Sequence, residues 1–294
     1  MDSVKKFLSS NGKVSIICAN TTEMVEYIRN LHDLTPTTSA VMGRFATISG
    51  MMGFTDIKED DDRLTIQIRG GGPIGSIISV VRKAENVSKI KAYMDNPHVE
   101  LPLKENGKID VGSAVGNTGF LNIIKKNEIV QDEGYTGLVP LVSGEIAEDF
   151  TEYFAKSEQK PTVLALGVLV NQNGIQASGG YMINLMPDAT EEDITKIEEA
   201  LKVAPSISQM LADNKSLEEI AKIVTGADVK LLEDNLKIEF ECDCNKETFE
   251  RGLISLGKDD LNQIIEEDGE ASVVCHFCNK KYHFTKEELQ NLLK

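Results

Sequence analysis

The chain has 294 residues, of which 41% are hydrophobic and 27% charged, so it has the composition of an ordinary globular protein with room for two domains. Its formal net charge of −16 at pH 7 disfavours nucleic acid and acidic membrane surfaces as partners, because both carry negative charge. The N-terminus lacks the apolar region and cleavage site of a signal peptide, and no apolar stretch is long enough to cross a bilayer. We therefore expect a cytoplasmic protein without nucleic-acid or membrane partners.

Residues 1–186 carry helix and strand patterns in mixed order and are predicted to form an α+β core domain. Residues 14–19 have the apolar composition of a buried strand. Residues 21–32 have the apolar spacing of an amphipathic helix, and residues 37–52 are predicted to be a mostly apolar helix rich in small residues. We expect this second helix to pack closely on several sides. Further strands are predicted at residues 64–69, 74–81 and 87–94.

The second half of this domain is predicted to contain a helix and a β-hairpin. Residues 117–128 are expected to form a turn followed by a strand, and residues 143–156 a helix with Ser143 as its N-terminal cap. Apolar runs at 163–170 and 175–185 flank an Asn-Gly pair, which indicates a hairpin turn. Strands joined by hairpins, with the helices segregated, are typical of the α+β class.

Residues 187–235 differ in character, with twelve acidic residues against five Lys and Arg, a net charge of −7, and no aromatic residue. Thr190 followed by Asp193, and Ser216 followed by Glu219, mark helix starts. Each predicted helix is too short to be stable alone and carries only a thin aliphatic stripe. The segment is therefore predicted to be a metastable helical linker that depends on a neighbouring domain.

Residues 236–294 are predicted to form a small C-terminal zinc and redox-switch domain. About 60 residues lie near the lower size limit for a lone hydrophobic core, so a metal cross-link would explain how this unit folds. The segment contains two short apolar helical stretches, and a final helix begins at Thr285, with Glu288 completing a capping box.

Four of the five cysteines lie in this last unit, as Cys242-x-Cys244 and, after thirty residues, Cys275-x-x-Cys278. Thiolates are soft ligands, and four of them suit tetrahedral zinc. In a reducing cytosol such clusters indicate metal or redox chemistry rather than structural disulfides. The sequence therefore predicts one Zn²⁺ per chain, bound by these four residues.

Three other side chains are weaker candidates. His276 and His283 lie near the second cysteine pair and could bind the metal, but four cysteines already fill a tetrahedral site, so roles outside the ligand set are favoured. Cys18 stands alone in a predicted strand and is expected to be a buried, inert thiol.

Oxidation would make such a zinc site a switch, because a disulfide sulfur is no longer a thiolate ligand. Zinc supplies ~10–16 kcal/mol of folding energy in small peptides. Disulfides within each pair would close loops of only three and four residues, worth ~1.5–2 kcal/mol each, whereas crossed disulfides would close long loops and keep the unit folded. Oxidation within the pairs is therefore expected to unfold the unit, release the linker and expose apolar surface that binds unfolded proteins.

Several sequence blocks besides the cysteines are similar to a known family. They are a glycine-rich segment at 69–75, blocks at 110–116 and 135–149, and shorter stretches at 157–159, 166–170, 179–180 and 185–187. Together with the cysteine pattern, these blocks resemble the 33 kDa chaperonin family, the redox-regulated holdases of the heat-shock class. Gly71 departs from the family's glycine-rich segment, where a polar or acidic residue is expected, but a glycine-rich turn tolerates this change.

The resemblance implies a chaperone rather than an enzyme. Family members are inactive while reduced and zinc-bound. Oxidants with heat form two disulfides, which in this chain would be Cys242–Cys244 and Cys275–Cys278, and release the zinc. The linker then unfolds, homodimers form, and unfolded client proteins are held without ATP.

Three alternative functions make different predictions. Gly70, Gly72 and Gly75 satisfy a dinucleotide fingerprint, but the residues that follow favour a strand instead of the helix that this motif requires. A thiol–disulfide oxidoreductase would place its C-x-x-C at a helix start, whereas this pair is expected in a hairpin turned by Asn279 and Lys280. A passive structural zinc ribbon, used only for interaction, would gain no activity on oxidation.

Overall fold

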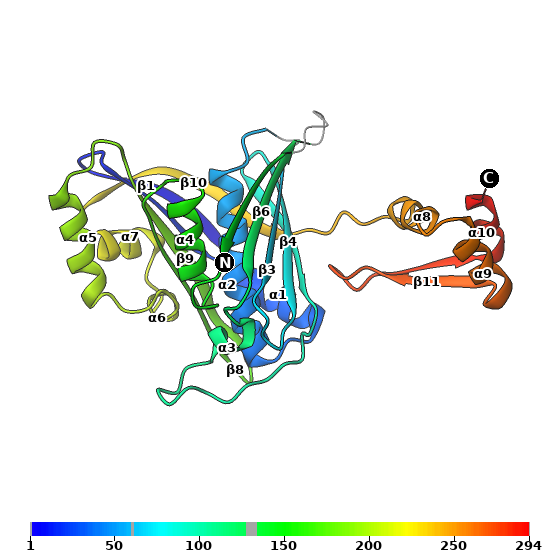
Figure 1. Cartoon of the computed structure of the whole chain (residues 1–294). Coiled ribbons are helices and arrows are strands. Elements are labelled where there is room, and N and C mark those ends of the chain that lie inside the picture. Colours follow the sequence, from blue (N-terminus) through cyan, green and yellow to red (C-terminus); the bar gives the residue numbers. More distant parts are fainter. Residues whose placement is uncertain (1, 60–61, 128–133, 294) are drawn as a thin grey trace. The chain divides into compact units, whose positions relative to one another are not determined.

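The computed structural model describes residues 2–59, 62–127 and 134–293, and Figure 1 shows its helices and strands. The chain divides into two compact units, residues 1–240 and residues 241–294, which we describe separately. In the described ranges, no helix is both long enough and apolar enough to span a bilayer. The mixture of helices and strands confirms the predicted α+β class.

Within its described residues, the first unit is built on one ten-stranded sheet with the strand order β7-β6-β3-β4-β5-β10-β1-β2-β9-β8. Neighbouring strands pair antiparallel except β5 and β10, which are parallel. Strand β10 therefore joins the two halves of the sheet. The strands are β1 (Ser3–Ser9), β2 (Val14–Asn20), β3 (Asp62–Arg69), β4 (Ser76–Ala84), β5 (Val87–Met94), β6 (Phe120–Asn127), β7 (Tyr135–Pro140), β8 (Thr162–Asn171), β9 (Gly174–Leu185) and β10 (Val229–Phe240).

Helix α2 (Pro36–Thr55) forms the centre of the main hydrophobic core, and nearly all of its residues are buried. Gly50 lies so close to β10 that a Cβ atom there would be 2.4 Å from Cγ2 of Ile238. The small residues of this helix thus allow the close packing that the sequence predicts. Helix α1 (Thr22–His32) contributes Met24, Val25 and Ile28 to the same core.

The glycine-rich segment is a turn between β3 and β4. The amide of Gly72 donates to the carbonyl oxygen of Val115 at 2.9 Å, and a Cβ atom at Gly72 would lie 2.4 Å from the carbonyl oxygen of Ala114. Strand β4 begins directly after Gly75. The segment therefore lacks the helix that a dinucleotide site requires, and its glycines serve close backbone packing instead.

The predicted hairpin is confirmed, since β8 and β9 are joined by a tight turn in which Asn171 pairs with Gly174.

Helix α4 (Ala147–Lys156) precedes this hairpin in the chain. The prediction that Ser143 caps this helix is wrong, because the helix begins four residues after Ser143. The buried side chain of Asp149, inside the helix, binds the backbone amides of the preceding loop instead. Its carboxylate accepts backbone hydrogen bonds from Val142, Ser143, Gly144 and Ile146 at 2.7–3.3 Å.

Three short helices follow the last hairpin, as the sequence predicts, and the capping box of Ser216 and Glu219 forms with hydrogen bonds of 2.7–3.2 Å. The helical prediction is wrong for residues 229–235, which begin strand β10 and pair with β1. The helices are α5 (Glu191–Val203), α6 (Ile207–Ala212) and α7 (Leu217–Thr225).

These three helices cover one face of β1, β2 and β9 (Figure 1) and enclose a second hydrophobic core, separate from the one around α2. We call α5, α6 and α7 the helical cover, and the strand face beneath it the covered face. The covered face consists of Phe7, Val14, Ile16, Cys18, Ala177, Tyr181 and Ile183. The helical cover contributes Ile197, Ile207, Met210, Leu211, Leu217, Ile220, Ala221 and Val224.

In the second unit, of which residues 241–293 are described, the core consists of six buried side chains. Thr285 and Glu288 form the predicted capping box at the start of the last helix. The buried residues are Leu253, Leu261, Ile265, Tyr282, Phe284 and Leu289. The elements are α8 (Lys246–Ile254), α9 (Lys258–Glu267), β11 (Glu270–Val274), β12 (Lys281–Thr285) and α10 (Lys286–Leu292). So small a core calls for a further cross-link.

The contact between α2 and β10 predicts a sharp response to one added methyl group. Gly50→Ala should destabilise the first unit by about 1–3 kcal/mol, because the new Cβ overlaps Ile238. Urea unfolding followed by circular dichroism measures the change. Gly252→Ala in α8 is the matched control, since its Cβ meets nothing within 4 Å. Equal effects of the two substitutions would contradict the close packing of α2.

Candidate metal and thiol site

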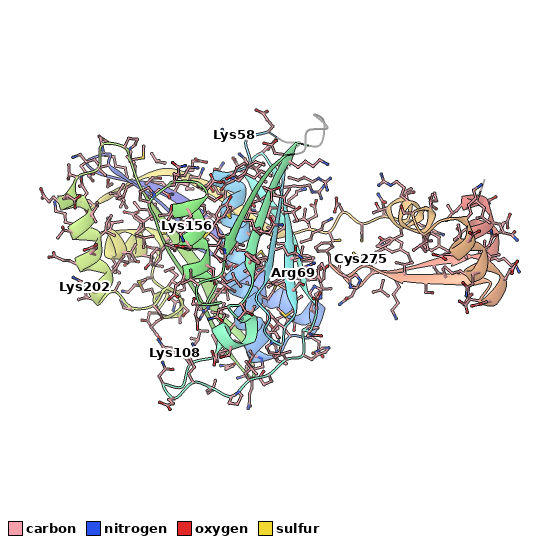
Figure 2. The ribbon with its side chains drawn as sticks, in the orientation of Figure 1. Lys58, Arg69, Lys108, Lys156, Lys202 and Cys275 are labelled. Carbon is pink, nitrogen blue, oxygen red and sulfur yellow. The ribbon has the colours of Figure 1, made fainter. Side chains whose placement is uncertain are left out.

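The four clustered cysteines come from two parts of the second unit. Cys242 and Cys244 lie in the irregular segment before α8, and Cys275 and Cys278 lie in the turn between β11 and β12; Figure 2 labels Cys275. The amide of Cys275 donates to the carbonyl oxygen of Lys280, and the amide of Asn279 donates to that of Cys275, which closes the turn. Asn279 has a φ of 58°, a conformation that Asn tolerates well. The hairpin expected at Asn279 and Lys280 is confirmed.

The fold brings all four Sγ atoms within 4.8 Å of one another. The Sγ atoms of Cys242 and Cys275 are 3.7 Å apart, and those of Cys244 and Cys278 are 3.4 Å apart. Four thiolates bound at ~2.3 Å to a tetrahedral ion have sulfur–sulfur edges of about 3.8 Å. The cluster therefore has the donor set and the spacing that fit a tetrahedral metal ion, and it could hold one.

All four cysteines are free thiols in this structure; Cys275 is buried and the other three are half-buried. Their surroundings give them different proton affinities. Burial raises the pKa of Cys242 and of Cys278. Burial also acts to raise the pKa of Cys244, but hydrogen bonds from Tyr282 and the neighbouring thiols outweigh it and lower that pKa. Compared with Cys242 and Cys278, Cys244 is thus the thiol whose surroundings favour the thiolate.

Tyr282 is a residue of this site that the motif does not reveal. Its hydroxyl donates to the carbonyl oxygen of Cys244 at 2.8 Å and lies 3.1 Å from the Sγ atom of the same residue. Its ring packs on Phe249 with the centroids 4.7 Å apart. Tyr282 therefore ties the first cysteine pair to β12. One feature of the sequence could have indicated this role. Tyr282 is an aromatic residue in the strand directly after the second cysteine pair, at a position whose side chain is buried.

The other candidates lie outside the cluster. The grouped donors are the four cysteines, without His276 or His283. His283 instead lies 3.4 Å from Ser272 and 3.6 Å from the carboxylate of Glu270, on the exposed side of the hairpin. Cys18 is fully buried in β2, and burial raises its pKa, which confirms the expected buried thiol.

The comparisons with known proteins agree with this fold and this site. The family model described as "Hsp33 protein" matches residues 2–285, and the chain therefore belongs to the Hsp33 family. Relatives named "33 kDa chaperonin" include that of Clostridioides difficile (strain 630), 46% identical over 294 residues, covering 100% of this chain and 99% of the relative. That of Bacillus subtilis (strain 168) is 44% identical over 293 residues, covering 99% and 98%.

The fold is similar to that of a solved structure. The crystal structure of the 33 kDa chaperonin (heat shock protein 33 homolog) from Thermotoga maritima superposes with a TM-score of 0.89 at 33% sequence identity. The match covers 99% of this chain and 97% of the other. The family resemblance seen in the sequence blocks is thereby confirmed over both units.

The geometry of the cluster predicts a four-thiolate ligand set. Co²⁺ added to the reduced, metal-free protein should give the strong visible and charge-transfer bands of tetrahedral thiolate coordination. Cys278→Ser should weaken and shift those bands, because a hydroxyl is a poor ligand for this set, whereas Cys18→Ala should leave them unchanged. Absorption spectra measured at one Co²⁺ per chain decide the matter, and unchanged bands in Cys278→Ser would remove that residue from the site.

Proposed function

We propose that this chain is a redox-regulated, ATP-independent holdase chaperone of the cytoplasm, not an enzyme. In its inactive form, Cys242, Cys244, Cys275 and Cys278 bind one zinc ion. Oxidation of the four cysteines unfolds the second unit, releases the helical cover and lets the protein bind unfolded client proteins as a homodimer. The observation that carries this proposal is an apolar strand face covered by three short helices, in a family whose relatives are named chaperonins.

Zinc is the metal that the donor set favours. Four sulfur ligands with near-tetrahedral spacing suit zinc, which has no redox chemistry of its own. When bound, the ion stabilises the thiolate forms and cross-links the segment before α8 to the β11–β12 turn. The six-residue core of this unit gives it little other support.

The redox step requires an external oxidant, for which we propose hydrogen peroxide. One thiolate attacks the peroxide and becomes a sulfenic acid, and the second thiol attacks that sulfur, so that one disulfide forms and two waters leave. Two thiols lose two electrons and two protons in each round. Two rounds consume all four thiols, and no thiolate ligand remains.

We propose the pairing Cys242–Cys244 and Cys275–Cys278, which follows the family resemblance. All four Sγ atoms lie within 4.8 Å of one another, so small side-chain movements could bring the two sulfurs of each proposed pair within bonding distance. Local pairing leaves the segment before α8 and the β11–β12 turn without a covalent link. The two short loops return only ~1.5–2 kcal/mol each, far less than the ~10–16 kcal/mol that zinc supplies.

The first helix of the helical cover, α5, is held by few buried side chains, which supports its release. In α5 only Asp193 and Ile197 are buried. A cavity of about 260 Å³ lies between this helix and the strands, lined by apolar side chains that include Val163, Ile183 and Leu201. Strand β10 connects α7 to the segment that contains Cys242, so the chain that follows the helical cover leads directly into the second unit. We propose that the covered face, once exposed, binds apolar segments of clients.

A thiol–disulfide oxidoreductase is less well supported. Its C-x-x-C would begin a helix, whereas Cys275 and Cys278 lie in a hairpin turn beside a second pair.

One assay separates the proposed function from a passive zinc ribbon. The reduced, zinc-loaded chain should leave the aggregation of a denatured test protein unchanged, and the peroxide-oxidised chain should suppress most of it without ATP. Light scattering follows aggregation, and a chelating dye follows the release of one zinc per chain. Cys18→Ala is the matched control and should be activated normally. Release of zinc without any suppression of aggregation would refute the chaperone proposal.

The covered face contains its own reporter, Cys18. In the reduced protein Cys18 should resist a maleimide, because it is fully buried and burial raises its pKa, while reaction requires an exposed thiolate. After oxidation Cys18 is the only thiol left and should be labelled once per chain, faster as pH rises toward the usual thiol pKa. Mass spectrometry counts the label. An oxidised, zinc-free chain with unlabelled Cys18 would mean that the helical cover stays in place.

A further inference from the structure

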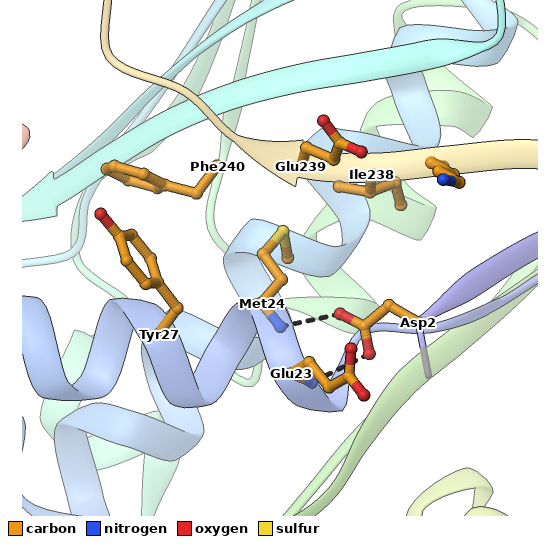
Figure 3. A pocket seen from close by; sticks show the side chains of 8 residues that line it. Asp2, Glu23, Met24, Tyr27, Ile238, Glu239 and Phe240 are labelled. Carbon is orange, nitrogen blue, oxygen red and sulfur yellow. Dashed lines mark hydrogen bonds between the residues drawn. The ribbon is translucent and has the colours of Figure 1, made fainter.

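A pocket of about 350 Å³ lies in the first unit between α1 and the end of β10. Figure 3 shows it as a slot with Asp2 toward one end and the rings of Tyr27 and Phe240 toward the other. Every residue that lines it belongs to the first unit. It lies apart from the cysteine cluster, and the redox proposal gives it no role.

The floor and the far end of the slot are apolar and aromatic. Met24 and Ile238 line the pocket with apolar side chains that are otherwise almost fully buried. The Tyr27 and Phe240 rings lie with their centroids 5.4 Å apart and their planes at 48°, and Tyr27 remains 53% exposed. An aromatic face open to a pocket attracts both apolar groups and cations.

The rim of the slot is negatively charged, with three carboxylates against the ammonium group of Lys237. The carboxylates belong to Asp2, Glu23 and Glu239. Asp2 accepts one backbone hydrogen bond on each oxygen, from the amides of Glu23 at 2.8 Å and Met24 at 2.7 Å. Each oxygen keeps a second acceptor site. Burial raises the pKa of Asp2, although these two bonds and the chain's N-terminal ammonium group act to lower it.

We propose that this pocket binds an organic cation on a short apolar stem, the chemistry of an arginine or lysine side chain. The stem lies over Met24 and Ile238, the cationic group contacts Asp2, and the aromatic ring of Tyr27 faces the bound molecule. A simple metal ion would leave the apolar floor and the aromatic ring unused. Because β10 forms one wall and α1 the other, a bound ligand holds the last strand of the first unit against α1.

Calorimetric titration of the full reduced chain tests this proposal with two probes. One is n-butylguanidinium, and the other is the peptide acetyl-Gly-Gly-Arg-Gly-Gly-amide. We expect saturable binding of one molecule per chain, while neutral n-butanol does not bind. Binding of the free cation alone assigns the site to small amines or guanidines, and binding of the peptide as well assigns it to basic polypeptide segments. Absence of saturable binding with both probes overturns the proposal.

Three variants locate the binding. Tyr27→Ala should weaken it about threefold, since it removes the ring. Asp2→Asn should weaken it about tenfold, since it removes the charge. Its single amide oxygen can accept from only one of the two α1 amides, so the melting temperature of this variant is compared with that of the parent. Glu105→Gln, which removes one exposed charge outside the pocket, should leave it unchanged.

Backbone hydrogen exchange adds a readout that does not depend on chaperone activity. The bound probe should slow exchange at Ile238 and Phe240, as their strand is held against α1. Equal weakening by Glu105→Gln, or no effect of Tyr27→Ala and Asp2→Asn in chains that melt like the parent, would reduce the binding to general attraction by an acidic protein.

Discussion

The convergence of four sulfur atoms within 4.8 Å is the constraint on which the second unit depends. It connects a segment without regular structure to a hairpin turn, and the hydrophobic core beside it has only six buried side chains. Tyr282 belongs to both arrangements, because its ring lies in that core and its hydroxyl bonds to Cys244. A change in the chemistry of the sulfurs therefore reaches the core directly, through Tyr282 and through Cys244, which also packs against it.

The sequence predicts most of the first unit because its signals are local. The apolar helix α2, the β8–β9 hairpin and the Ser216 capping box each depend on residues close together in the chain. Of the two errors, one comes from a long-range pairing and the other from a competing side chain six residues away. Residues 229–235 carry many charges and resemble their helical neighbours, yet they pair with β1, more than 200 residues away. The Ser143 cap fails because the buried Asp149 carboxylate takes the loop amides instead.

The candidate site shows the same division. The four sulfur donors could be predicted because the spacing of the cysteines in the sequence is typical of a metal site. The hairpin turn at Asn279 could be predicted as well, because it depends on neighbouring residues. Tyr282 could not be assigned a partner, since its hydroxyl reaches a carbonyl group 38 residues earlier. The pocket beside α1 could not be predicted from the sequence either, because its lining residues Asp2, Tyr27 and Phe240 come from distant parts of the chain.

The two cores of the first unit are covered by different helices, and strand β2 contributes side chains to both cores. Ile17 and Ala19 face the core around α2, while Ile16 and Cys18 face the helical cover. A strand with one face in water normally alternates apolar and polar residues, but β2 is apolar on both faces and requires two coverings. Helix α2 provides one that is nearly all buried. The other consists of short helices, of which α5 buries two residues and encloses a cavity. Because burial of apolar area stabilises by roughly 25 cal/mol per Å², α5 is the helix of this second covering whose removal costs the least free energy.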